Sequence, residues 1–474
     1  MSLAAQKKLS ERQLLFSHFA NKLATAENFN RKVVSFQANK EEPFYRWFKY
    51  KEGFSSNLIT YLLTKYSPSP GKLLDPFAGT GTALFAAQEL GWETFGIELL
   101  PVGTFVMRSR EALHSIMVEN LKTAMITLWS DIARIKHVET KIQHISITRD
   151  AFPDETEQML NKYLTFCSTQ KDKQIQAVLQ FAAFSVLEGI SFTRKDGQYL
   201  RWDYRSVRKL SGKPFNKGAI LTFETAVTNK LNQIIQDLSS TQPQTLFETS
   251  KTMKAGGLPI QLIEGSCLEE LPKLEECLFD FIITSPPYCN RYDYTRTYAL
   301  ELVYLGYNHD QVRELRQSML SCTVENKDKV EILKQFYFSL GRQNAFTKVM
   351  GVYDASATMS EINGVLDELN RSKRLNNNNI PRMVKNYFLE LCFVIYEMAR
   401  VTKMGGYCVM VNDNVRYGGE EIPVDLVLSE FAENFGFNVK EIFVLPKGKG
   451  NSSQQMGNYG RTEIRKCVYL WQKE

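Results

Sequence analysis

Short apolar runs alternate with amphipathic stretches along this chain, and the alternation predicts an α/β fold. Near-continuous runs of Ile, Leu, Val and Phe predict buried strands at residues 72–75, 93–98, 260–264, 279–284 and 407–411. Helical periodicity covers segments between them, such as 82–90, 384–401 and 425–435. Strands that are apolar on both faces and joined through helices are typical of a doubly wound, mostly parallel sheet.

Two long insertions interrupt this alternation. The first has a largely helical pattern, and the second contains the polar tract NNNN at 376–379. Near the C-terminal end, apolar runs at 437–445 and 466–471 flank a polar loop and predict an antiparallel hairpin that closes the sheet. Insertions of this size in an α/β core usually serve recognition or regulation, so the first insertion is expected to hold the target-recognition region and the second to share that role through DNA contacts. We therefore expect parts of a catalytic core to alternate with the two insertions, in five regions at 1–102, 103–258, 259–300, 301–383 and 384–474.

Composition adds an ordinary globular background. The 474 residues are 43% hydrophobic and carry a formal net charge of +6. No run approaches the roughly 18–20 apolar residues of a membrane span, and the N-terminus lacks the apolar region of a signal peptide, which predicts a cytoplasmic protein without membrane contact. The eight cysteines are scattered without a CxxC pair or a histidine cluster, so neither a metal site nor a disulfide framework is expected.

The segment LLDPFAGTGT, residues 73–82, is the first candidate for chemistry. A strand ends at Asp75, glycines follow at Gly79 and Gly81, and a helix begins near Thr82. Glycines let the backbone approach a ligand closely, and the amides of a helix start are donors. Glu98 ends the next strand, where an acidic side chain can accept hydrogen bonds from both hydroxyls of a ribose. The turn by itself is equally consistent with a plain tight turn, and Glu98 favours a nucleotide-type ligand.

The second candidate is FDFIITSPPY, residues 279–288, in which an apolar strand runs into Ser-Pro-Pro-Tyr. Pro286 and Pro287 fix the backbone and lack N–H groups, which leaves only carbonyl acceptors there. Ser285 adds a side-chain acceptor, and Tyr288 supplies a flat stacking surface. Acceptors beside a ring suit a planar group that carries an NH2; the alternative is a rigid proline turn.

Together, DPFAGTGT and TSPPY resemble the cofactor and catalytic motifs of the DNA amino-methyltransferases, the N4-cytosine and N6-adenine enzymes of restriction–modification systems. RWFKYKEGFSSNLITYLL at 46–63 resembles the segment that closes over the methionine end of the cofactor, which points to Lys51, Phe54 and Ser55. Residues 409–437 resemble the strand, loop and helix that complete the catalytic half. The resemblance covers about 43–102, 259–300 and 384–474, and implies a class I, Rossmann-like methyltransferase fold.

The resemblance implies S-adenosyl-L-methionine as cofactor and a role for each matching residue. Glu98 holds the ribose, and Ser266 or Cys267 stands where the family often has an acidic residue near the adenine. The remaining residues of the implied cofactor site are Phe54, Ser55, Asp75, Phe77, Ala78, Gly79, Thr80, Gly81 and Thr82. Ser285 and the carbonyl of Pro286 accept hydrogen bonds from the target amino group, with Pro287 completing the motif, and Tyr288 stacks on the flipped base. Cytosine C5 methylation is excluded, because it needs a Pro-Cys nucleophile and this dipeptide does not occur.

Serine before the two prolines goes more often with cytosine in this family, so N4-cytosine methylation of duplex DNA is the leading interpretation. N6-adenine methylation, methylation of an RNA amino group, and a catalytically silent DNA-binding subunit remain open as alternatives. The resemblance also implies a cognate restriction endonuclease in the same system, and we expect the protein to act as a monomer.

A basic, aromatic stretch at 191–217 in the first insertion is the candidate for DNA recognition. It holds eight Lys or Arg residues against two Asp, an excess equal to that of the whole chain. Arginine with aromatic rings suits phosphate contacts, base readout and stacking. The candidate contacts are Arg194, Lys195, Arg201, Trp202, Tyr204, Arg205 and Arg208. Near-helical spacing predicts that Arg201, Arg205 and Arg208 share one helix face; the alternative is a solvated basic segment with rings packed on the core.

Overall fold

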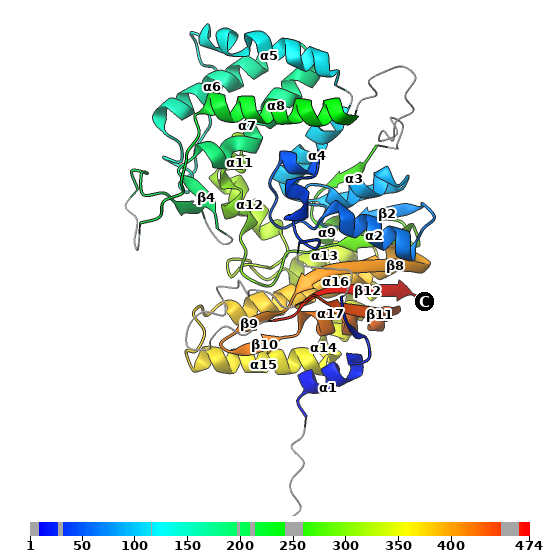
Figure 1. Ribbon diagram of the computed structural model, residues 1–474. Coiled ribbons are helices and arrows are strands. Elements are labelled where there is room, and N and C mark those ends of the chain that lie inside the picture. Colours follow the sequence, from blue (N-terminus) through cyan, green and yellow to red (C-terminus); the bar gives the residue numbers. More distant parts are fainter. Residues whose placement is uncertain are drawn as a thin grey trace, which may run out of the picture.

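The computed structural model describes residues 9–26, 32–114, 116–196, 200–208, 214–241, 259–446 and 464–474. Its centre is an eight-stranded sheet in the order β1-β11-β12-β8-β7-β2-β3-β6 (Figure 1). The strands are β1 (Leu23–Thr25), β2 (Lys72–Asp75), β3 (Glu93–Glu98), β6 (Gln261–Glu264), β7 (Phe279–Thr284), β8 (Thr402–Asp413), β11 (Phe437–Val444) and β12 (Lys466–Lys473). All neighbouring pairs are parallel except the two that β12 makes with β8 and β11. This arrangement confirms the predicted α/β class, the five predicted strands and the closing hairpin.

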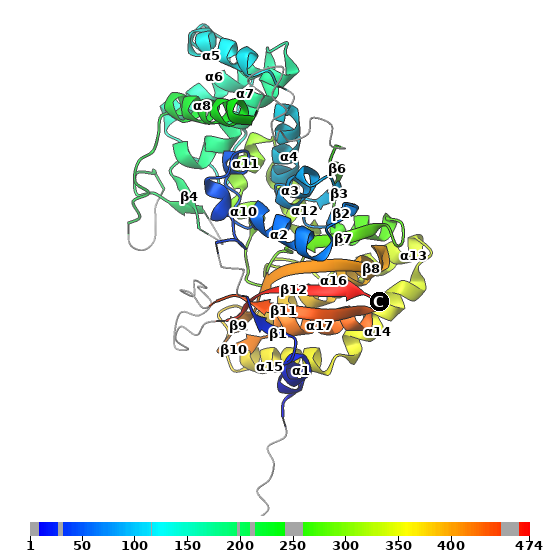
Figure 2. The same cartoon turned by 45° about the vertical axis from the view of Figure 1, so that its right-hand side comes forward.

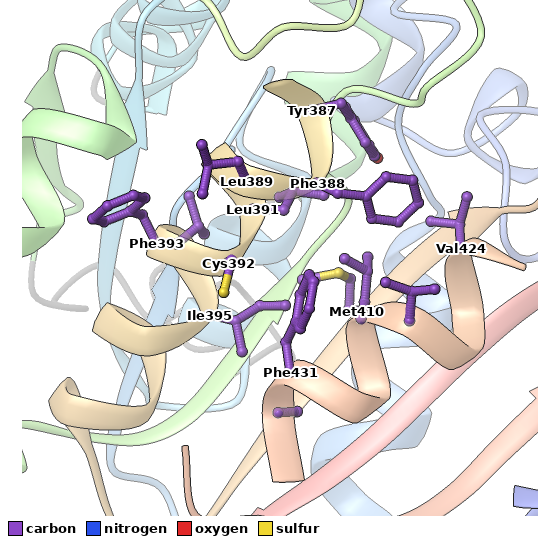
Figure 3. Packing of buried hydrophobic residues seen from close by; sticks show 14 of the residues in the cluster. Tyr387, Phe388, Leu389, Leu391, Cys392, Phe393, Ile395, Met410, Val424 and Phe431 are labelled. Atoms are coloured by element: carbon purple, nitrogen blue, oxygen red, sulfur yellow. The ribbon is translucent and has the colours of Figure 1, made fainter. Parts of the chain in front are cut away.

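Helices cover both faces of the sheet, which explains why the strands are apolar on both sides. Leu73, Phe281 and Ile283 pack toward α2 (Ser56–Tyr66) and α3 (Thr82–Glu89) on one face. Leu74 and Ile282 pack on the opposite face, which is covered by α9 (Cys267–Glu270), α16 (Ile380–Val401) and α17 (Val424–Asn434). Figure 3 shows the core between α16, α17 and β8. The sheet is therefore buried as a central layer, as a parallel sheet requires.

A second, helical body stands above the sheet (Figures 1 and 2). It contains α4 (Pro101–His114), α5 (Val118–Ala133), α6 (Asp154–Ser168), α7 (Lys173–Ile190) and α8 (Phe223–Thr241), and a small hairpin of β4 (Thr193–Lys195) and β5 (Leu200–Trp202). These elements confirm the largely helical first insertion. The same core also includes residues of α10 (Tyr294–Thr297), α11 (Ala299–Tyr304) and α12 (His309–Ser318), which follow the SPPY motif. The helical body is thus built from segments on both sides of the catalytic motif in the sequence.

The rest of the second insertion packs against the sheet body. Helices α13 (Val330–Ser339), α14 (Gln343–Ala355) and α15 (Ala357–Arg371) share one core with α16 and α17, and α1 (Glu11–Phe19) packs beside α15 and α17. A short antiparallel pair, β9 (Val415–Tyr417) and β10 (Glu420–Ile422), leads from β8 into α17. Within the described ranges, no helix combines the length and apolar character that crossing a membrane requires.

Candidate active site

The glycine-rich turn between β2 and α3 forms one wall of the site. Gly79 and Gly81 have φ angles of +55° and +77°, which glycine adopts without the strain that a Cβ brings. A Cβ on Gly79 would lie 3.1 Å from the ring of Tyr50, and one on Gly81 would lie 2.8 Å from the side chain of Met107. The backbone of the turn therefore lies closer to its neighbours than any other residue type allows.

Helix α4 holds the turn from behind, although no sequence motif marks it. A Cβ on Gly103 would overlap the carbonyl oxygen of Gly79, so this helix passes the turn at its closest possible distance. The buried Arg110 donates from Nη1 to the carbonyl oxygen of Thr80 at 2.8 Å and from Nη2 to that of Tyr45 at 3.2 Å. Burial lowers the pKa of Arg110 to about 10, which still leaves the guanidinium charged at neutral pH. The first helix of the insertion thus fixes the shape of the turn.

Glu98, at the end of β3, spans the turn and the next loop. Its Oε2 accepts a hydrogen bond from the amide of Gly79 and its Oε1 accepts one from the amide of Leu100, both at 2.6 Å. Burial raises the pKa of Glu98 to about 8, against the opposing effect of these two amides. Ligand hydroxyls that donate to its remaining lone pairs would stabilise the ionised form further.

Asp75 connects the two sequence motifs. Its Oδ1 accepts hydrogen bonds from the hydroxyl of Thr284 at 2.8 Å and from the amide of Phe77 at 3.0 Å. Thr284 directly precedes Ser285, so this buried carboxyl ties the end of β2 to the end of β7. Burial raises the pKa of Asp75 to about 7. The parallel pairing of β2 with β7 places both motifs at the same edge of the sheet, where open α/β sheets bind ligands.

A pocket with about 570 Å³ of empty space opens at this edge. Five residues of the predicted site line it: Phe77, Gly79, Glu98, Ser266 and Pro287. Cys267, the sequence alternative to Ser266, also lines it. Sequence reasoning did not single out the other lining residues, which are Tyr50, Glu52, Pro76, Ile97, Leu99, Leu100, Gly265, Tyr294, Met319 and Leu320. The pocket thus joins the cofactor motif to the catalytic motif.

The remaining predicted cofactor residues support the pocket without lining it. Ser55 is fully buried, caps α2 and donates from Oγ to the carbonyl oxygen of Val33 at 2.6 Å, while Phe54 packs in the core beside α2. Asp75, Ala78, Thr80, Gly81 and Thr82 are all buried in or beside the turn. Ser266 lines the pocket but donates its hydroxyl to the carbonyl oxygen of Ser318 at 3.2 Å.

Tyr50 and Glu52 belong to the segment that the sequence singled out, on either side of Lys51. Tyr298 stacks on Tyr50 with ring centroids 5.2 Å apart, and the hydroxyl of Tyr298 donates to Glu52 Oε2 at 2.6 Å. Burial raises the pKa of Glu52. Lys51 donates to the carbonyl oxygen of Lys195. Residues 51 and 52 form a turn, so no strand or helix period in the sequence marks Tyr50 and Glu52 as lining residues.

The SPPY segment follows β7 at the mouth of the pocket. Ser285 Oγ lies 3.1 Å from the carbonyl oxygen of Val411 and 3.2 Å from the hydroxyl of Tyr288. The Ser285 hydroxyl is placed to donate to either oxygen, and its own lone pairs can still accept a hydrogen bond. Burial raises the pKa of Tyr288 above its ordinary value, so its hydroxyl stays protonated. The loop beyond is held by the hydroxyl of Tyr417, which donates to the carbonyl oxygen of Cys289 at 2.6 Å.

Lys195 differs from the other candidate DNA contacts, because it lies inside the protein with 3% of its surface exposed. Its ammonium pairs with Glu301 at 2.5 Å and lies 4.3 Å from the ring centroid of Tyr298. A lysine so enclosed cannot reach a phosphate, and we leave it out of the DNA-contacting set. Through Tyr298 it connects the β4–β5 hairpin to the wall of the pocket.

The predicted helical face of Arg201, Arg205 and Arg208 is wrong. Arg201 lies in β5, and residues 203–208 form turns. Aromatic neighbours and local acids, which periodicity does not encode, determine the positions of these side chains. Arg201 lies 4.1 Å from the ring centroid of Phe215, and Arg205 pairs with Asp203 at 2.6 Å.

The remaining candidates surround this hairpin. Arg208 lies 3.9 Å from the ring centroid of Trp202, and it donates to the carbonyl oxygens of Ser146 and Arg149. Arg194 and Tyr204 are exposed. Residues 197–199 and 209–213 of the predicted stretch lie outside the described residues. The cations of the hairpin are therefore ordered by rings and carbonyls on its surface.

The fold and the site together define a Rossmann-like methyltransferase. The sheet is doubly wound with the antiparallel strand β12 between β8 and β11, and the pocket lies between a glycine-rich turn and an SPPY loop. No protein-family model matches the chain. It is 45% identical over 461 residues to the Type II methyltransferase M.AvaI of Nostoc sp., and this alignment covers 97% of this chain and 92% of the relative. The same values hold for M.AvaI of Anabaena variabilis. It is 41% identical over 481 residues to the Type II methyltransferase M.BsoBI of Geobacillus stearothermophilus, covering 98% and 92% of the two chains. The chain belongs to the Type II methyltransferases, the site-specific DNA-modifying enzymes of restriction–modification systems.

Proposed function

We propose that this methyltransferase transfers a methyl group from S-adenosyl-L-methionine to the exocyclic N4 of cytosine in duplex DNA. The observation that carries the proposal is the position of Ser285 directly after β7, where its Oγ lies 3.1 Å from the carbonyl oxygen of Val411 and can donate to it. The hydroxyl oxygen is thereby oriented as an acceptor for an amino group. Serine at this position is the residue that the family pairs more often with cytosine than with adenine.

The pocket supports the choice of cofactor. It opens at the carboxyl ends of the parallel strands, which is the edge where open α/β sheets bind ligands. The carboxylate of Glu98 lies at the end of β3, next to the turn, as ribose recognition requires. Gly79 presents backbone without a side chain, and the apolar walls at Phe77 and Leu100 suit a flat base and an aliphatic chain.

The cofactor supplies a methyl group on a sulfonium, which is reactive enough that positioning is the main task of the protein. Ser285 Oγ and the carbonyl oxygen of Pro286 accept hydrogen bonds from the two N–H groups of the target amino group. The nitrogen lone pair then faces the pocket, where Pro287 forms part of the wall. Tyr288 stacks on the base, which must leave the duplex to reach this loop. No protein nucleophile takes part.

The product decides between cytosine and adenine. The purified protein is incubated with mixed-sequence duplex DNA and methyl-labelled cofactor, and the DNA is digested to nucleosides for mass spectrometry. We expect N4-methylcytosine. N6-methyladenine as the sole product would refute the cytosine assignment. The roles of Ser285 and Pro286 would stand, because the same acceptors serve an adenine amino group.

Tyr288 offers a matched pair of variants for the stacking role. Tyr288→Phe keeps the ring and removes the hydroxyl, so we expect turnover near that of the wild type. Tyr288→Ala removes the ring and should reduce turnover strongly, since stacking contributes about 1–3 kcal/mol per base. Single-turnover rates at saturating DNA measure both, and equal rates for the two variants would exclude stacking.

The β4–β5 hairpin is the proposed DNA-contacting element of the helical body, through Arg194, Arg201, Trp202, Tyr204, Arg205 and Arg208. Neutralising a phosphate releases counterions, so each lost contact flattens the log–log salt dependence of binding by about 0.9 units. The double variant Arg194→Gln, Arg201→Gln should bind duplex DNA more weakly and with a flatter salt slope, with unchanged affinity for the cofactor. An unchanged slope would identify the hairpin as a solvated face.

A further inference from the structure

The connection between α15 and α16 is a short basic segment that lies beside the catalytic loop. Residues 371–382, RSKRLNNNNIPR, contain four Lys or Arg residues and no acid. Arg291, three residues beyond Tyr288, donates from Nη1 to Asn376 Oδ1 at 3.0 Å. Two segments that are 85 residues apart in the sequence therefore meet next to the target-base motif.

The β9–β10 pair completes this surface. Arg374 donates to the carbonyl oxygen of Gly418, between the two strands, at 3.2 Å, and Arg416 of β9 donates to that of Gly419 at 2.8 Å. Tyr417 reaches the catalytic loop from the same hairpin through the carbonyl oxygen of Cys289. We call this surface the basic rim and define it by Arg291, Lys373, Arg374, Arg382 and Arg416.

The contacts within the basic rim fix the side chains and leave their charge in place. Arg374 and Arg382 bond to backbone carbonyls, of Gly418 and Val324 respectively, at 3.2 and 3.1 Å. A guanidinium has five N–H donors, and a neutral carbonyl takes one of them without cancelling the charge. Arg374, Arg382 and Lys373 are all exposed.

Nearby acids are engaged with other cations. Glu368, at the end of α15, pairs with Arg371 at 2.9 Å. Glu420 of β10 pairs with Arg12 at 3.1 Å. These two acids are thus paired with residues outside the basic rim, and its five cations place positive charge next to the catalytic loop.

We propose that the basic rim binds the phosphate backbone of duplex DNA on one flank of the target base, as a second DNA-contacting surface in addition to the β4–β5 hairpin. The proposal rests on the proposed action on duplex DNA. The β4–β5 and β9–β10 hairpins lie on the same side of the molecule, one on the helical body and one on the sheet body (Figures 1 and 2). Guanidinium groups that are fixed in place beside the exit of a flipped base are suited to hold the strand from which it leaves.

The test measures binding of mixed-sequence duplex DNA at several salt concentrations, because phosphate contacts do not depend on sequence. The test variant is Lys373→Asn, Arg382→Gln, in which asparagine tolerates the positive φ of 55° at residue 373. We expect its salt slope to be flatter than that of the wild type by about 1.8 units, or 0.9 per contact. Its affinity for S-adenosylhomocysteine should be unchanged.

Two control variants separate charge from folding. Lys334→Gln, Lys348→Gln removes the same charge from exposed positions on α13 and α14, away from β9 and β10 in Figure 2, and should keep the wild-type slope. Lys373→Arg, Arg382→Lys keeps the charge within the basic rim and should also keep the slope.

Equal slopes for the test variant and the Lys334, Lys348 control would overturn the proposal. The readout is binding and not methyl transfer, so an unexpected product base would refute the proposed function without affecting this slope.

Discussion

Substitution of Glu98 by glutamine tests how the protein recognises the cofactor. Each carboxylate oxygen accepts one backbone N–H at 2.6 Å, from Gly79 and from Leu100. Glutamine retains one acceptor oxygen and turns an NH2 group toward the other amide, so one of these bonds is lost. A hydrogen bond to a charged group contributes about 1.5–3 kcal/mol. The hydroxyls of a bound ribose lose the same negative partner.

We therefore expect Glu98→Gln to weaken binding of S-adenosylhomocysteine by about 1.5–3 kcal/mol, which is roughly 10- to 150-fold in Kd. Titration calorimetry on wild type and variant at about pH 9, above the pKa of about 8 of the Glu98 carboxyl, gives this difference directly. A ligand analogue without ribose hydroxyls separates the two roles of the carboxylate. It should bind wild type and variant with nearly equal affinity if the carboxylate acts on the ribose.

Glu111→Gln is the matched control. Glu111 is also a partly buried carboxylate that accepts a backbone N–H, from Ile260 at 3.0 Å, but it does not line the pocket. The affinity of Glu111→Gln for S-adenosylhomocysteine should equal that of the wild type. If Glu98→Gln also bound the ligand within about twofold of wild type, Glu98 would be only a brace for the turn, and ribose recognition would belong to other residues.

Three further predictions follow from the site. Burial raises the pKa values of Asp75 and Glu98 to about 7 and about 8, so the folded apo-protein retains protons that the unfolded chain releases near pH 4. Its free energy of unfolding should therefore fall from pH 5 to pH 9. Denaturant titrations should show that Asp75→Asn flattens this decline. Ser285→Ala should lower kcat by roughly 10- to 100-fold with calorimetric cofactor affinity intact, because its acceptor acts on the reacting amino group, and an unchanged kcat would remove Ser285 from catalysis. Gly81→Ala should lower the unfolding free energy by about 1–3 kcal/mol, more than Gly341→Ala, since both have positive φ but only Gly81 has a side chain within 3 Å of the added Cβ.

Features that depend on neighbouring residues were predictable from the sequence. Burial on both faces favours apolar residues on both sides of a strand, so the apolar runs within KLLD and FDFIIT identified β2 and β7. The turn needs positive φ at residues 79 and 81, and the glycines at these positions indicate it in the sequence. Parallel pairing of β2 with β7, which are neighbours in the sheet but not successive in the chain, places their ends at one edge, and the two motifs share a pocket for that reason.

Contacts between distant segments were decided only by the tertiary structure. Lys195 resembles a DNA contact in the sequence, but its partner Glu301 is 106 residues away, and only folding brings that buried carboxylate to it. Arg201, Arg205 and Arg208 have helical spacing, yet Phe215, Asp203 and Trp202 determine where their side chains lie.

The basic segment at 371–382 lies beside the catalytic loop because α15 and α16 pack into the same core as α17 and the sheet. Local sequence encodes backbone preference and burial of each element. Which charged side chain meets which partner depends on how those elements pack, and the free energy that selects this packing is distributed over the whole core.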